Sequence, residues 1–532
     1  MHTTSFDYIV VGAGSAGCVI ASRLSENKTV SVCLIEAGGN DKGAMVQMPA
    51  GVAASVPYGI NSWHYNTLPQ KELNNRCGFM PRGKVLGGSS SINAMVYIRG
   101  NKHDYNSWAA LGNEGWDYES LLPYFIKAEN NKTFTESNVH GVYGPLHVQD
   151  LSQPSPVNQL FLNACEQQGV PHNADINAGQ QVGARLSQVT QYQGERCSAA
   201  KAYITPHLNR KNLTVLSKVH VNKVLFCDKT ATGVSVSINN KAVVLHAKKE
   251  VLLSAGAINS PQILMLSGVG PKEQLKQHNI NIVNELSGVG ENLHDHLTVV
   301  PLYKAKYSKG TFGISAGGAF NIAKGCVDWF VKREGQLTSN FAESHAFIKL
   351  FSDSKVPDVQ LEFVIGLVDD HSRKLHLGHG YSIHCSIMHP KSRGTIRLAD
   401  ANPLSVPLID PNYLSHPDDL NVLLAGLKKT LQIMQSEAFD VIRGNMVYPL
   451  DINNNEQLIE YIRQTAETEY HPVGTCKMGQ DAMAVVNSQL QVHGVKNLRV
   501  VDASIMPHII TGNTNACVIA IAEKAADLIK LA

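Results

Sequence analysis

Residues 7–39 of the chain read DYIVVGAGSAGCVIASRLSENKTVSVCLIEAGG, and this stretch decides the first unit of the fold. Tyr8 to Val11 form a short run of aromatic and β-branched residues, which is typical of a strand buried on both faces. The pattern then predicts a helix that ends at about Leu24 and a second strand from Val30 to Ile35. Between the first strand and the helix stands a glycine fingerprint of the GxGxxG type, formed by Gly12, Gly14 and Gly17.

Each glycine of this fingerprint has a physical role in a dinucleotide-binding unit. The first permits a tight turn, the second lets the backbone approach a pyrophosphate, and the third lets the helix pack on the strand. The free amides at the helix N-terminus attract phosphate, and Glu36 at the end of the second strand can accept hydrogen bonds from both hydroxyls of an adenosine ribose. We therefore predict a site for NAD or FAD, with an ordinary βαβ unit as the alternative.

Composition and charge exclude several other classes of protein. A chain of 532 residues predicts two or three domains, and its apolar fraction of 43% is that of a globular protein. A net charge of +2, with both signs interspersed, gives no electrostatic case for a nucleic-acid partner. The ten cysteines show no CxxC spacing, which argues against a metal site and against a disulfide framework. A reducing cytoplasm is the setting that this cysteine usage favours.

Several later stretches resemble the signature segments of the glucose-methanol-choline oxidoreductases, a family of FAD enzymes. This resemblance extends from residue 6 to about residue 528. The stretches are PRGKVLGGSSSINAMVYIRG at residues 81–100, GAINSPQILMLSGVG at 256–270, SGVGENLHDH at 287–296, HPVGTCKMG at 471–479 and NLRVVDASIMPHIITGNTNA at 497–516.

The resemblance implies a mixed α+β and α/β fold, in which a Rossmann-like FAD-binding domain is joined to a second, antiparallel-sheet substrate domain. The alternating stretch PDVQLEFVI and the helical pattern DDLNVLLAGLKKTLQIM, both beyond residue 300, agree with a second domain of a different kind, and SRGTIRLAD predicts another of its strands. We predict that the FAD-binding domain comprises residues 1–155, 190–300 and 465–532, and that the substrate domain comprises residues 156–189 and 301–464.

The family motifs also imply which residues contact FAD. In some choline oxidases a Gly-Gly-x-Ser-Ser-His-Asn loop carries a histidine bonded covalently to the flavin, whereas this chain has Ile92 in that place, so we expect non-covalent FAD. A hairpin predicted from VHVNKVLF and TGVSVSI supplies one backbone contact to the adenine. The expected cofactor-binding residues are Gly12, Gly14, Ser15, Ala16, Gly17, Glu36, Ala37, Val85, Gly87, Gly88, Asn93, Ala94, Met95, Val96, Val221, Asp502, Ala503, Asn513 and Thr514.

Alcohol oxidation beside a flavin needs a base for the hydroxyl proton and a donor for the alcohol oxygen. Histidine suits the first role because its ordinary pKa of about 6.5 lies near working pH. An asparagine amide suits the second, since it can stabilise alkoxide character without adding charge. The resemblance assigns these roles to His471, which matches the family's catalytic histidine, and to Asn515, which matches a position that is His or Asn in different members. His384 and His389 are expected to be structural or to line the pocket wall.

Within the family, the motifs look most like those of the FAD alcohol dehydrogenases of bacterial alkane-degradation systems and of bacterial choline dehydrogenases. This implies oxidation of a primary, aliphatic alcohol to the aldehyde, with electrons passed to a quinone or another non-oxygen acceptor. The alternatives are a choline dehydrogenase, an alcohol oxidase that produces peroxide, and an FAD-containing hydroxynitrile lyase. A choline site needs aromatic faces and a carboxylate. No acid in residues 301–464 can be singled out for that role; Glu343 is a candidate, but a structural role is favoured.

Residues 311–331, TFGISAGGAFNIAKGCVDWFV, form an apolar and glycine-rich stretch that Lys324 and Asp328 make too polar to span a membrane. Two interpretations stay open: an active-site lid, or a segment that lies in a membrane interface. We expect a cytoplasmic protein, and the resemblance adds the alternative of peripheral association with the cytoplasmic side of the inner membrane.

Overall fold

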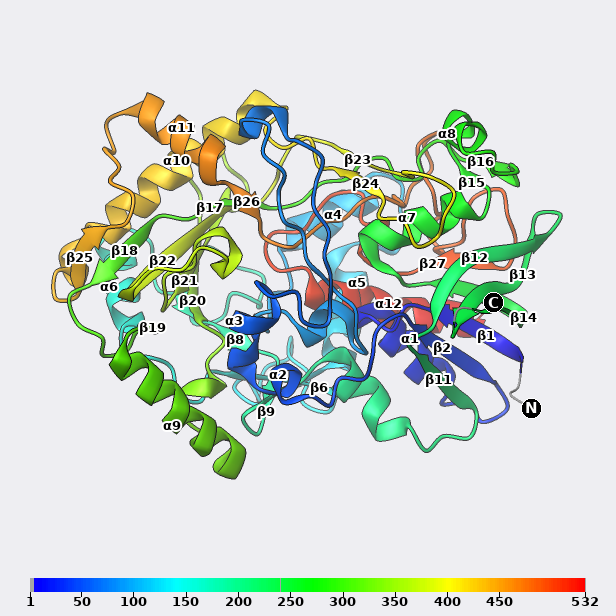
Figure 1. Ribbon diagram of the computed structural model, residues 1–532, viewed down its shortest axis with the longest axis horizontal. Helices are drawn as coiled ribbons and strands as arrows, with labels where there is room; N and C mark the ends of the chain where they lie inside the picture. The colour runs from blue at the N-terminus through cyan, green and yellow to red at the C-terminus, as the bar shows by residue number, and fades with distance from the viewer. Residues whose placement is uncertain (1–3, 240, 532) are drawn as a thin grey trace.

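The computed structural model describes residues 4–239 and 241–531. Two large β-sheets lie at opposite ends of the longest axis, with both chain termini beside the sheet on the right of Figure 1. The segment after the second strand crosses to the other side of the molecule and the chain later returns, so each sheet is assembled from pieces that are distant in sequence.

The first sheet is mixed and seven-stranded, in the order β11-β2-β1-β14-β13-β12, with β27 also paired to β14. Pairing is parallel among β11, β2, β1, β14 and β27 and antiparallel among β12, β13 and β14. The predicted hairpin is therefore confirmed as β12–β13. The strands are β1 (Ser5–Val11), β2 (Val32–Glu36), β11 (Leu213–Ser217), β12 (His220–Cys227), β13 (Thr230–Ile238), β14 (Lys241–Leu253) and β27 (Leu498–Val500).

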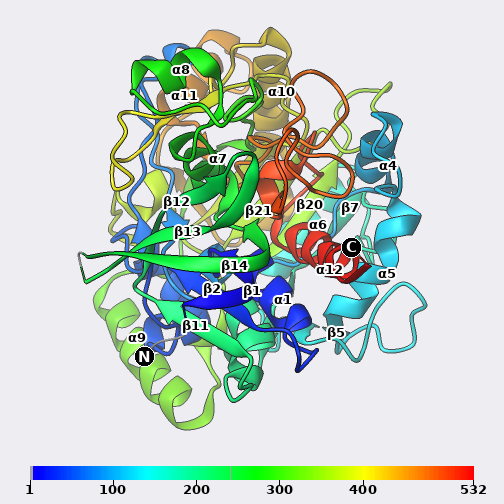
Figure 2. The same cartoon turned by 90° about the vertical axis from the view of Figure 1, so that its right-hand side faces the viewer.

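Apolar strands at the centre of this sheet are buried because helices cover it. All five residues of β2 are buried, as the continuous apolar run predicts. Helix α1 (Ser15–Leu24) follows β1 directly and packs against α12 (Asn515–Leu531), which in turn packs against α5 (Tyr118–Ala128); Figure 2 shows these three helices on the same side of the sheet. The predicted strand–helix–strand unit at the N-terminus is thus present.

The second sheet is antiparallel and nine-stranded, in the order β25-β18-β22-β21-β20-β7, with β17 and β19 paired to β22 and β26 paired to β17. The mixed and antiparallel sheets together confirm the predicted fold class. The strands are β7 (Gly183–Leu186), β17 (Leu297–Val299), β18 (Leu302–Ala305), β19 (Gly313–Ile314), β20 (Ala342–Ile348), β21 (Val359–Val364), β22 (Gly378–Ile387), β25 (Arg443–Met446) and β26 (Glu467–Thr468).

One face of the antiparallel sheet packs against helices and the other faces a cavity. Helix α10 (Pro417–Met434), predicted from its helical spacing, lies against β22, and α6 (Asn158–Gln167) lies against β20. The approach is close at Gly426, where a Cβ would lie 2.7 Å from Sγ of Cys385. Because side chains alternate along a strand, the neighbours of Cys385 on β22 point the other way, and His384 reaches the cavity.

The remaining helices and strands lie outside the two large sheets. They are the helices α2 (Ala44–Gln47), α3 (Val52–Ser55), α4 (Lys102–Ala110), α7 (Gly256–Leu266), α8 (Lys272–Gln277), α9 (Ala316–Lys332) and α11 (Asn455–Thr465), and the strands β3 (Ser62–Trp63), β4 (Arg82–Gly83), β5 (Glu129–Asn131), β6 (Leu146–Asp150), β8 (Gln188–Val189), β9 (Gln191–Tyr192), β10 (Glu195–Arg196), β15 (Val269–Gly270), β16 (Asn284–Glu285), β23 (Thr395–Arg397) and β24 (Leu408–Asp410).

Some sequence expectations differ from the observed strands. The stretch SRGTIRLAD yields only the short β23, which pairs with β24 outside the large antiparallel sheet. Strands β17 and β26 belong to the antiparallel sheet, although they fall within the segments 190–300 and 465–532 that we predicted for the FAD-binding domain. The segment boundaries of the two domains stay a prediction.

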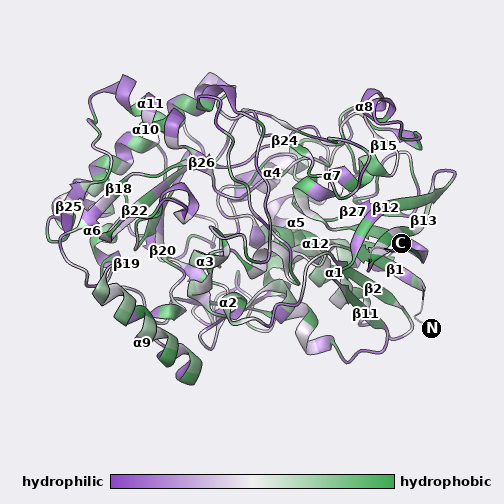
Figure 3. Ribbon diagram, viewed as in Figure 1, coloured by the Kyte–Doolittle hydropathy of each residue, from purple (hydrophilic) through white to green (hydrophobic). Residues whose placement is uncertain are grey.

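The stretch 311–331 is mostly helical in the structure. Helix α9 begins after Ser315, whose side chain accepts a hydrogen bond from the amide of Gly318, and it extends away from the body of the molecule at the lower left of Figure 1. Figure 3 shows that much of this helix is hydrophobic. Within residues 4–239 and 241–531, none of the helices combines the length and the apolarity needed to cross a bilayer.

Candidate active site

A cavity of about 570 Å³ extends from the glycine loop after β1 to the inner face of the antiparallel sheet. Its walls come from both sheets, from residues 88–96 and from the C-terminal segments around His471 and Asn515. The cavity therefore joins the glycine fingerprint to four of the five family motifs, although they are separated by hundreds of residues, while residues 287–296 do not line it.

The glycine loop leaves no room for side chains where the cavity meets β1. Gly12 has a φ of +95°, and a Cβ there would lie 2.6 Å from the carbonyl oxygen of Ser254. A Cβ at Gly88, from the second loop, would lie 2.6 Å from Cα of Gly14. Helix α1 has no side-chain cap at its start, so its first amides are free to bind an anion in the cavity. This end of the cavity fits the pyrophosphate of a dinucleotide.

Glu36 lies at the end of β2 and also lines the cavity. Its carboxylate accepts hydrogen bonds from the amides of Ala13, at 3.0 Å, and Gly38, at 2.8 Å. Burial raises the pKa of Glu36 to about 7, although these amides and Lys84 act in the opposite direction. A ribose hydroxyl that donates to this carboxylate would stabilise its charged form, so the residue fits the role that the sequence suggested.

Most of the expected cofactor-binding residues line the cavity, and three do not. Gly17 packs against the loop itself, since a Cβ there would lie 1.9 Å from the carbonyl oxygen of Gly12. Val85 is buried and bridges to Gly39, and Gly87 forms a turn at a φ of +89°. The residues of the set that line the cavity are Gly12, Gly14, Ser15, Ala16, Glu36, Ala37, Gly88, Asn93, Ala94, Met95, Val96, Val221, Asp502, Ala503, Asn513 and Thr514.

Asp502 lines the cavity but its carboxylate is already occupied. It accepts hydrogen bonds from the amide of Gly256 at 2.8 Å, from Oγ of Ser260 at 2.5 Å and from the amide of Ser504 at 2.8 Å. These bonds tie the C-terminal segment to the start of α7. Asp502 therefore shapes the wall of the cofactor end of the cavity.

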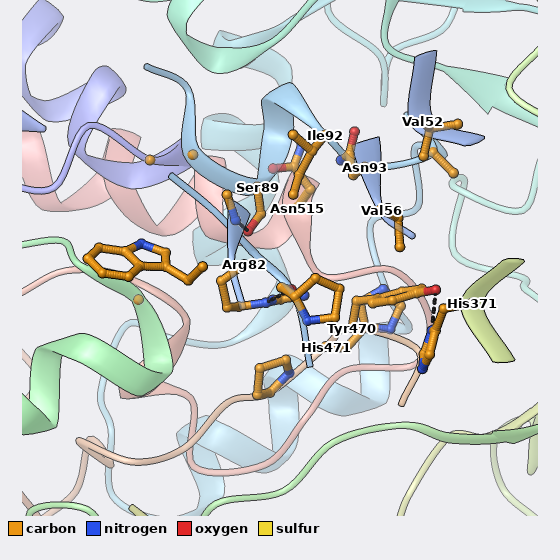
Figure 4. Close-up of a pocket in the computed structure, with 18 of the residues that line it drawn as sticks. Val52, Val56, Arg82, Ser89, Ile92, Asn93, His371, Tyr470, His471 and Asn515 are labelled. Carbon is orange, nitrogen blue, oxygen red and sulfur yellow. Dashed lines mark hydrogen bonds between the residues drawn. The ribbon is translucent and has the colours of Figure 1, made fainter. Parts of the chain in front are cut away.

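His471 lies at the centre of the cavity wall, where Figure 4 shows it with Tyr470 and Arg82. Its backbone amide donates to Oδ1 of Asp295 at 2.8 Å, which fixes the segment after β26. Burial lowers the pKa of His471 well below its usual value, and the neighbours His296 and Arg82 lower it further. The ring is therefore neutral at physiological pH and can accept a proton.

The amide beside His471 is that of Asn513. Its Nδ2 lies 3.4 Å from Nε2 of His471 and 3.0 Å from Oε1 of Glu362. Asn515 instead begins α12, and its Oδ1 accepts a hydrogen bond from Oγ of Ser15 at 2.6 Å, at the start of α1. The family motif predicts Asn515 at the substrate and Asn513 at the cofactor, whereas in the structure Asn513 contacts His471 and Asn515 contacts Ser15. Because the two asparagines are only two residues apart on a turn, sequence spacing alone does not show which of them faces His471.

Two buried acids on the cavity wall were missed by the sequence analysis. Glu362 of β21 accepts hydrogen bonds from Nε2 of Gln360 and from Asn513, and burial together with the nearby Glu469 raises the pKa of Glu362 to about 8. Oε2 of Glu469 has no hydrogen-bond partner among the described residues and lies 3.6 Å from Nδ1 of His384. The sequence singles out no acid between residues 301 and 464 for a cation site, whereas in the structure Glu362 of that range lines the cavity.

Two other expectations about polar residues can be compared with the structure. Glu343 is not a cavity residue: its carboxylate accepts hydrogen bonds from Ser155, Asn158 and Ser339. His384 does line the cavity wall. Burial acts to lower the pKa of His384. The neighbouring Glu469 and Glu467 outweigh burial and raise this pKa above its usual value.

Apolar side chains form much of the remaining wall and the mouth. Ile92, where a covalent link to a flavin would need a histidine, faces the cavity. The mouth includes the exposed side chains of Tyr58, Ile314, Ile322 and Leu375, so residues of the 311–331 stretch do border the opening. The apolar lining also includes Val52, Val56, Val96, Phe312, Phe341, Val364, Leu367 and Val368.

The chain is similar to one known protein family and to several of its members over most of its length. The GMC oxidoreductase model matches with its N-terminal part over residues 6–298 and with its C-terminal part over residues 390–522. An alcohol dehydrogenase [acceptor] of Pseudomonas putida is 44% identical over 527 residues, covering 98% of this chain and 95% of the relative. An oxygen-dependent choline dehydrogenase of Photobacterium profundum is 40% identical over 99% of this chain and 93% of its own length. The mitochondrial choline dehydrogenase of Homo sapiens is 41% identical over 99% and 90%.

Solved structures give the same assignment. The pyridoxine 4-oxidase of Mesorbium loti superposes with a TM-score of 0.89 at 30% sequence identity, covering 98% of each chain. A formate oxidase superposes with a TM-score of 0.92 at 26% identity, covering 100% of this chain and 99% of its own. The likeness therefore extends over both sheets.

Proposed function

This chain belongs to the GMC oxidoreductase family and is an FAD-dependent enzyme that oxidises alcohols, and from that premise we propose that it converts a primary aliphatic alcohol to the aldehyde. The observation that carries the proposal is the pair formed by the buried ring of His471 and the amide of Asn513, 3.4 Å apart in a largely apolar cavity. The electrons pass to a quinone or another non-oxygen acceptor.

Bound FAD would supply the acceptor for the hydride of the carbinol carbon. The first amides of α1 would hold its pyrophosphate, and Glu36 would hold the adenosine ribose. With Ile92 in place of a linking histidine, the cofactor is held without a covalent bond. Asn515, tied to Ser15 at the start of α1, belongs to this cofactor-binding set rather than to the catalytic pair.

His471 acts as the general base. Its Nε2 takes the hydroxyl proton of the substrate, and a base placed in this way contributes a factor of about 10² to 10⁴ to the rate. Nδ2 of Asn513 donates to the same oxygen as negative charge develops there, and one such donor contributes a factor of about 10² to 10³. Glu362 orients Asn513, since Oε1 of Glu362 accepts from Nδ2 and keeps the amide nitrogen facing His471.

An aliphatic substrate is favoured by the apolar wall and by the alcohol dehydrogenase [acceptor] among the relatives. Each methylene group buried in such a wall contributes about 0.8 kcal/mol of binding free energy. The mouth of the cavity is apolar at Ile314, Ile322 and Leu375, so a hydrocarbon chain can enter along apolar side chains.

A cationic alcohol such as choline is the second candidate, and one observation favours it. Oε2 of Glu469 is buried without a hydrogen-bond partner among the described residues, and the aromatic ring of Tyr470 lines the cavity beside it. A carboxylate and an aromatic face are what a quaternary ammonium group needs. Choline dehydrogenases are also among the relatives.

We further propose that α9 rests on the surface of the inner membrane, on its cytoplasmic side, where a quinone is available. Phe320, Val327, Phe330 and Val331 are between 59% and 74% exposed, although large apolar side chains are normally buried. Lys324 and Lys332 of the same helix are exposed and suit anionic lipid headgroups.

Anaerobic mixing of the yellow holoenzyme with alcohols tests the proposed reaction. Bleaching of the flavin absorbance by octanol, followed by recovery on adding a soluble quinone, is the expected outcome. A flavin that stays yellow with every alcohol would favour a hydroxynitrile lyase, and recovery in air as fast as with quinone would favour an oxidase that produces peroxide.

A further inference from the structure

We propose that His296 is a positioning residue that fixes the tautomer of His471, so that the unprotonated ring nitrogen of His471 faces the substrate. The inference rests on the proposed function and adds a residue that does not touch the substrate. His296 stands immediately before β17, is fully buried, and is not part of the cavity wall.

A backbone carbonyl fixes the hydrogen position on His296. Nε2 of His296 lies 3.2 Å from the carbonyl oxygen of Met388, and a carbonyl oxygen can only accept a hydrogen bond. Nε2 of His296 must therefore carry the hydrogen. Burial, with a contribution from His389, lowers the pKa of His296 to about 3, so the ring is neutral and has only one N–H. Its other nitrogen, Nδ1, is left as an acceptor.

The position of the hydrogen on the ring of His471 is then fixed as well. Nδ1 of His471 lies 3.0 Å from Nδ1 of His296, and the two rings are nearly perpendicular, at 88°. Because Nδ1 of His296 accepts, Nδ1 of His471 must donate. The neutral ring of His471 therefore presents a bare Nε2 to the cavity, which is the form that a general base needs.

Asn513 gives an independent check on this order. Its Nδ2 can only donate, and it lies 3.4 Å from Nε2 of His471. The oxygen of the same amide is also placed, because Oδ1 of Asn513 accepts a hydrogen bond from Nε2 of Gln360 at 3.0 Å while Nδ2 donates to Oε1 of Glu362. The opposite tautomer of His471 would set two lone pairs against each other at His296 and two N–H groups against each other at Asn513.

The chain of hydrogen bonds also explains what happens after proton transfer. When Nε2 of His471 takes the hydroxyl proton, the ring becomes positively charged and its Nδ1–H bond to His296 strengthens, since one partner is now ionised. His296 therefore stabilises the protonated base without becoming charged. A residue that only filled space at this position would not have this effect.

A matched pair of variants tests the proposal in the holoenzyme. His296→Asn keeps an acceptor oxygen close to the place of Nδ1, whereas His296→Leu has the same branching and number of side-chain heavy atoms as asparagine but no acceptor. We expect the rate of flavin reduction by octanol to fall about 10- to 100-fold in the leucine variant and to stay within a few-fold of wild type in the asparagine variant. Equal rates in the two variants, whether high or low, would overturn the proposal.

A second measurement is independent of activity and of the variants' folding. In wild-type holoenzyme labelled with ¹⁵N-histidine, the ring nitrogens of His471 are assigned from the signals lost in His471→Gln. We expect a protonated Nδ1 and an unprotonated Nε2. A protonated Nε2 would overturn this proposal even if the enzyme oxidises alcohols. An enzyme that is inactive with every alcohol would overturn the proposed function, but the tautomer of His471 could still be measured.

Discussion

The amide nitrogen of Asn513 lies 3.4 Å from Nε2 of His471, and this contact joins the turn before α12 to the segment after β26. The two residues are separated by forty-two positions, yet only one of the asparagines in the TGNTNA motif reaches the histidine. Which asparagine is adjacent to the base is therefore a property of the turn.

The pair Asn513→Ala and Asn515→Ala follows from this geometry. Removing Asn513 takes a donor from the alkoxide, so we expect flavin reduction to slow by about 10²-fold with normal FAD content. Removing Asn515 breaks the bond to Ser15, so we expect weaker FAD binding and a smaller change in the reduction rate of enzyme saturated with FAD. Stopped-flow reduction and FAD titration measure the two effects. The reverse pattern would restore Asn515 to the catalytic pair.

His471→Gln removes the base while keeping a side chain of similar reach. We expect the holoenzyme to retain its yellow colour and fold, and to lose alcohol oxidation by about 10³-fold or more, since base catalysis and the orientation of the hydroxyl are lost together. Single-turnover reduction measures the loss. A variant within a few-fold of wild type would show that another group takes the proton.

Stability of the protein should fall as pH rises through the range in which Glu362 titrates. Burial raises the pKa of Glu362 from 4.5 to about 8 in the folded state, so between these values the folded state binds more protons than the unfolded state. The free energy of unfolding therefore decreases with increasing pH across that window, by on the order of 1 kcal/mol per unit. Denaturant unfolding of the apoprotein from pH 5 to pH 8 measures the slope.

Glu362→Gln should make that slope shallower, because a neutral amide binds no proton in either state. Glu273→Gln is the matched control, since the Glu273 side chain is 84% exposed on α8 and its removal should leave the slope as in wild type. An unchanged slope in Glu362→Gln would show that the carboxyl is ionised in the folded state.

Chain length of the alcohol should set the catalytic efficiency. With about 0.8 kcal/mol per buried methylene group, kcat/KM should rise about fourfold per carbon from butanol and level off near octanol. Choline should be slower, because burying its charge requires a cation site. Initial rates with a quinone analogue and with oxygen measure both substrate and acceptor preference. Should choline be faster, Glu469→Gln should abolish that preference and leave octanol oxidation unchanged.

Membrane contact through α9 can be tested with anionic lipid vesicles. Replacing Phe320 and Phe330 together by serine removes two exposed aromatic side chains, so we expect sedimentation with vesicles of phosphatidylglycerol and phosphatidylethanolamine to fall several-fold while kcat for a soluble alcohol is retained. Tyr143→Ser is the control, because Tyr143 is 96% exposed outside α9. Equal sedimentation of wild type and the double variant would exclude this helix as the contact.

The sequence by itself predicted the parts of the fold that depend on local pattern. The buried strand before Gly12, the helix after Gly14 and the acid at the end of β2 all follow from residue types within one short stretch, because tight backbone approach leaves glycine no substitute there. The resemblance of the later motifs then gave FAD, the family and a second, antiparallel domain. The sequence did not predict which sheet β17 and β26 join, because these two strands are too short to carry a pattern.

The tertiary structure alone decided which side chains meet in the cavity. The acid Glu362 comes from β21, Asn513 from the turn before α12, and His296 from the segment before β17, and no spacing in the sequence relates them to His471. Their roles depend on hydrogen bonds of about 3 Å, whereas a shift of one residue along a strand or turn moves a side chain to the opposite face. The sequence therefore determined that an alcohol-oxidising flavin site is present, and the packing of the two sheets determined which amide, which acid and which second histidine surround its base.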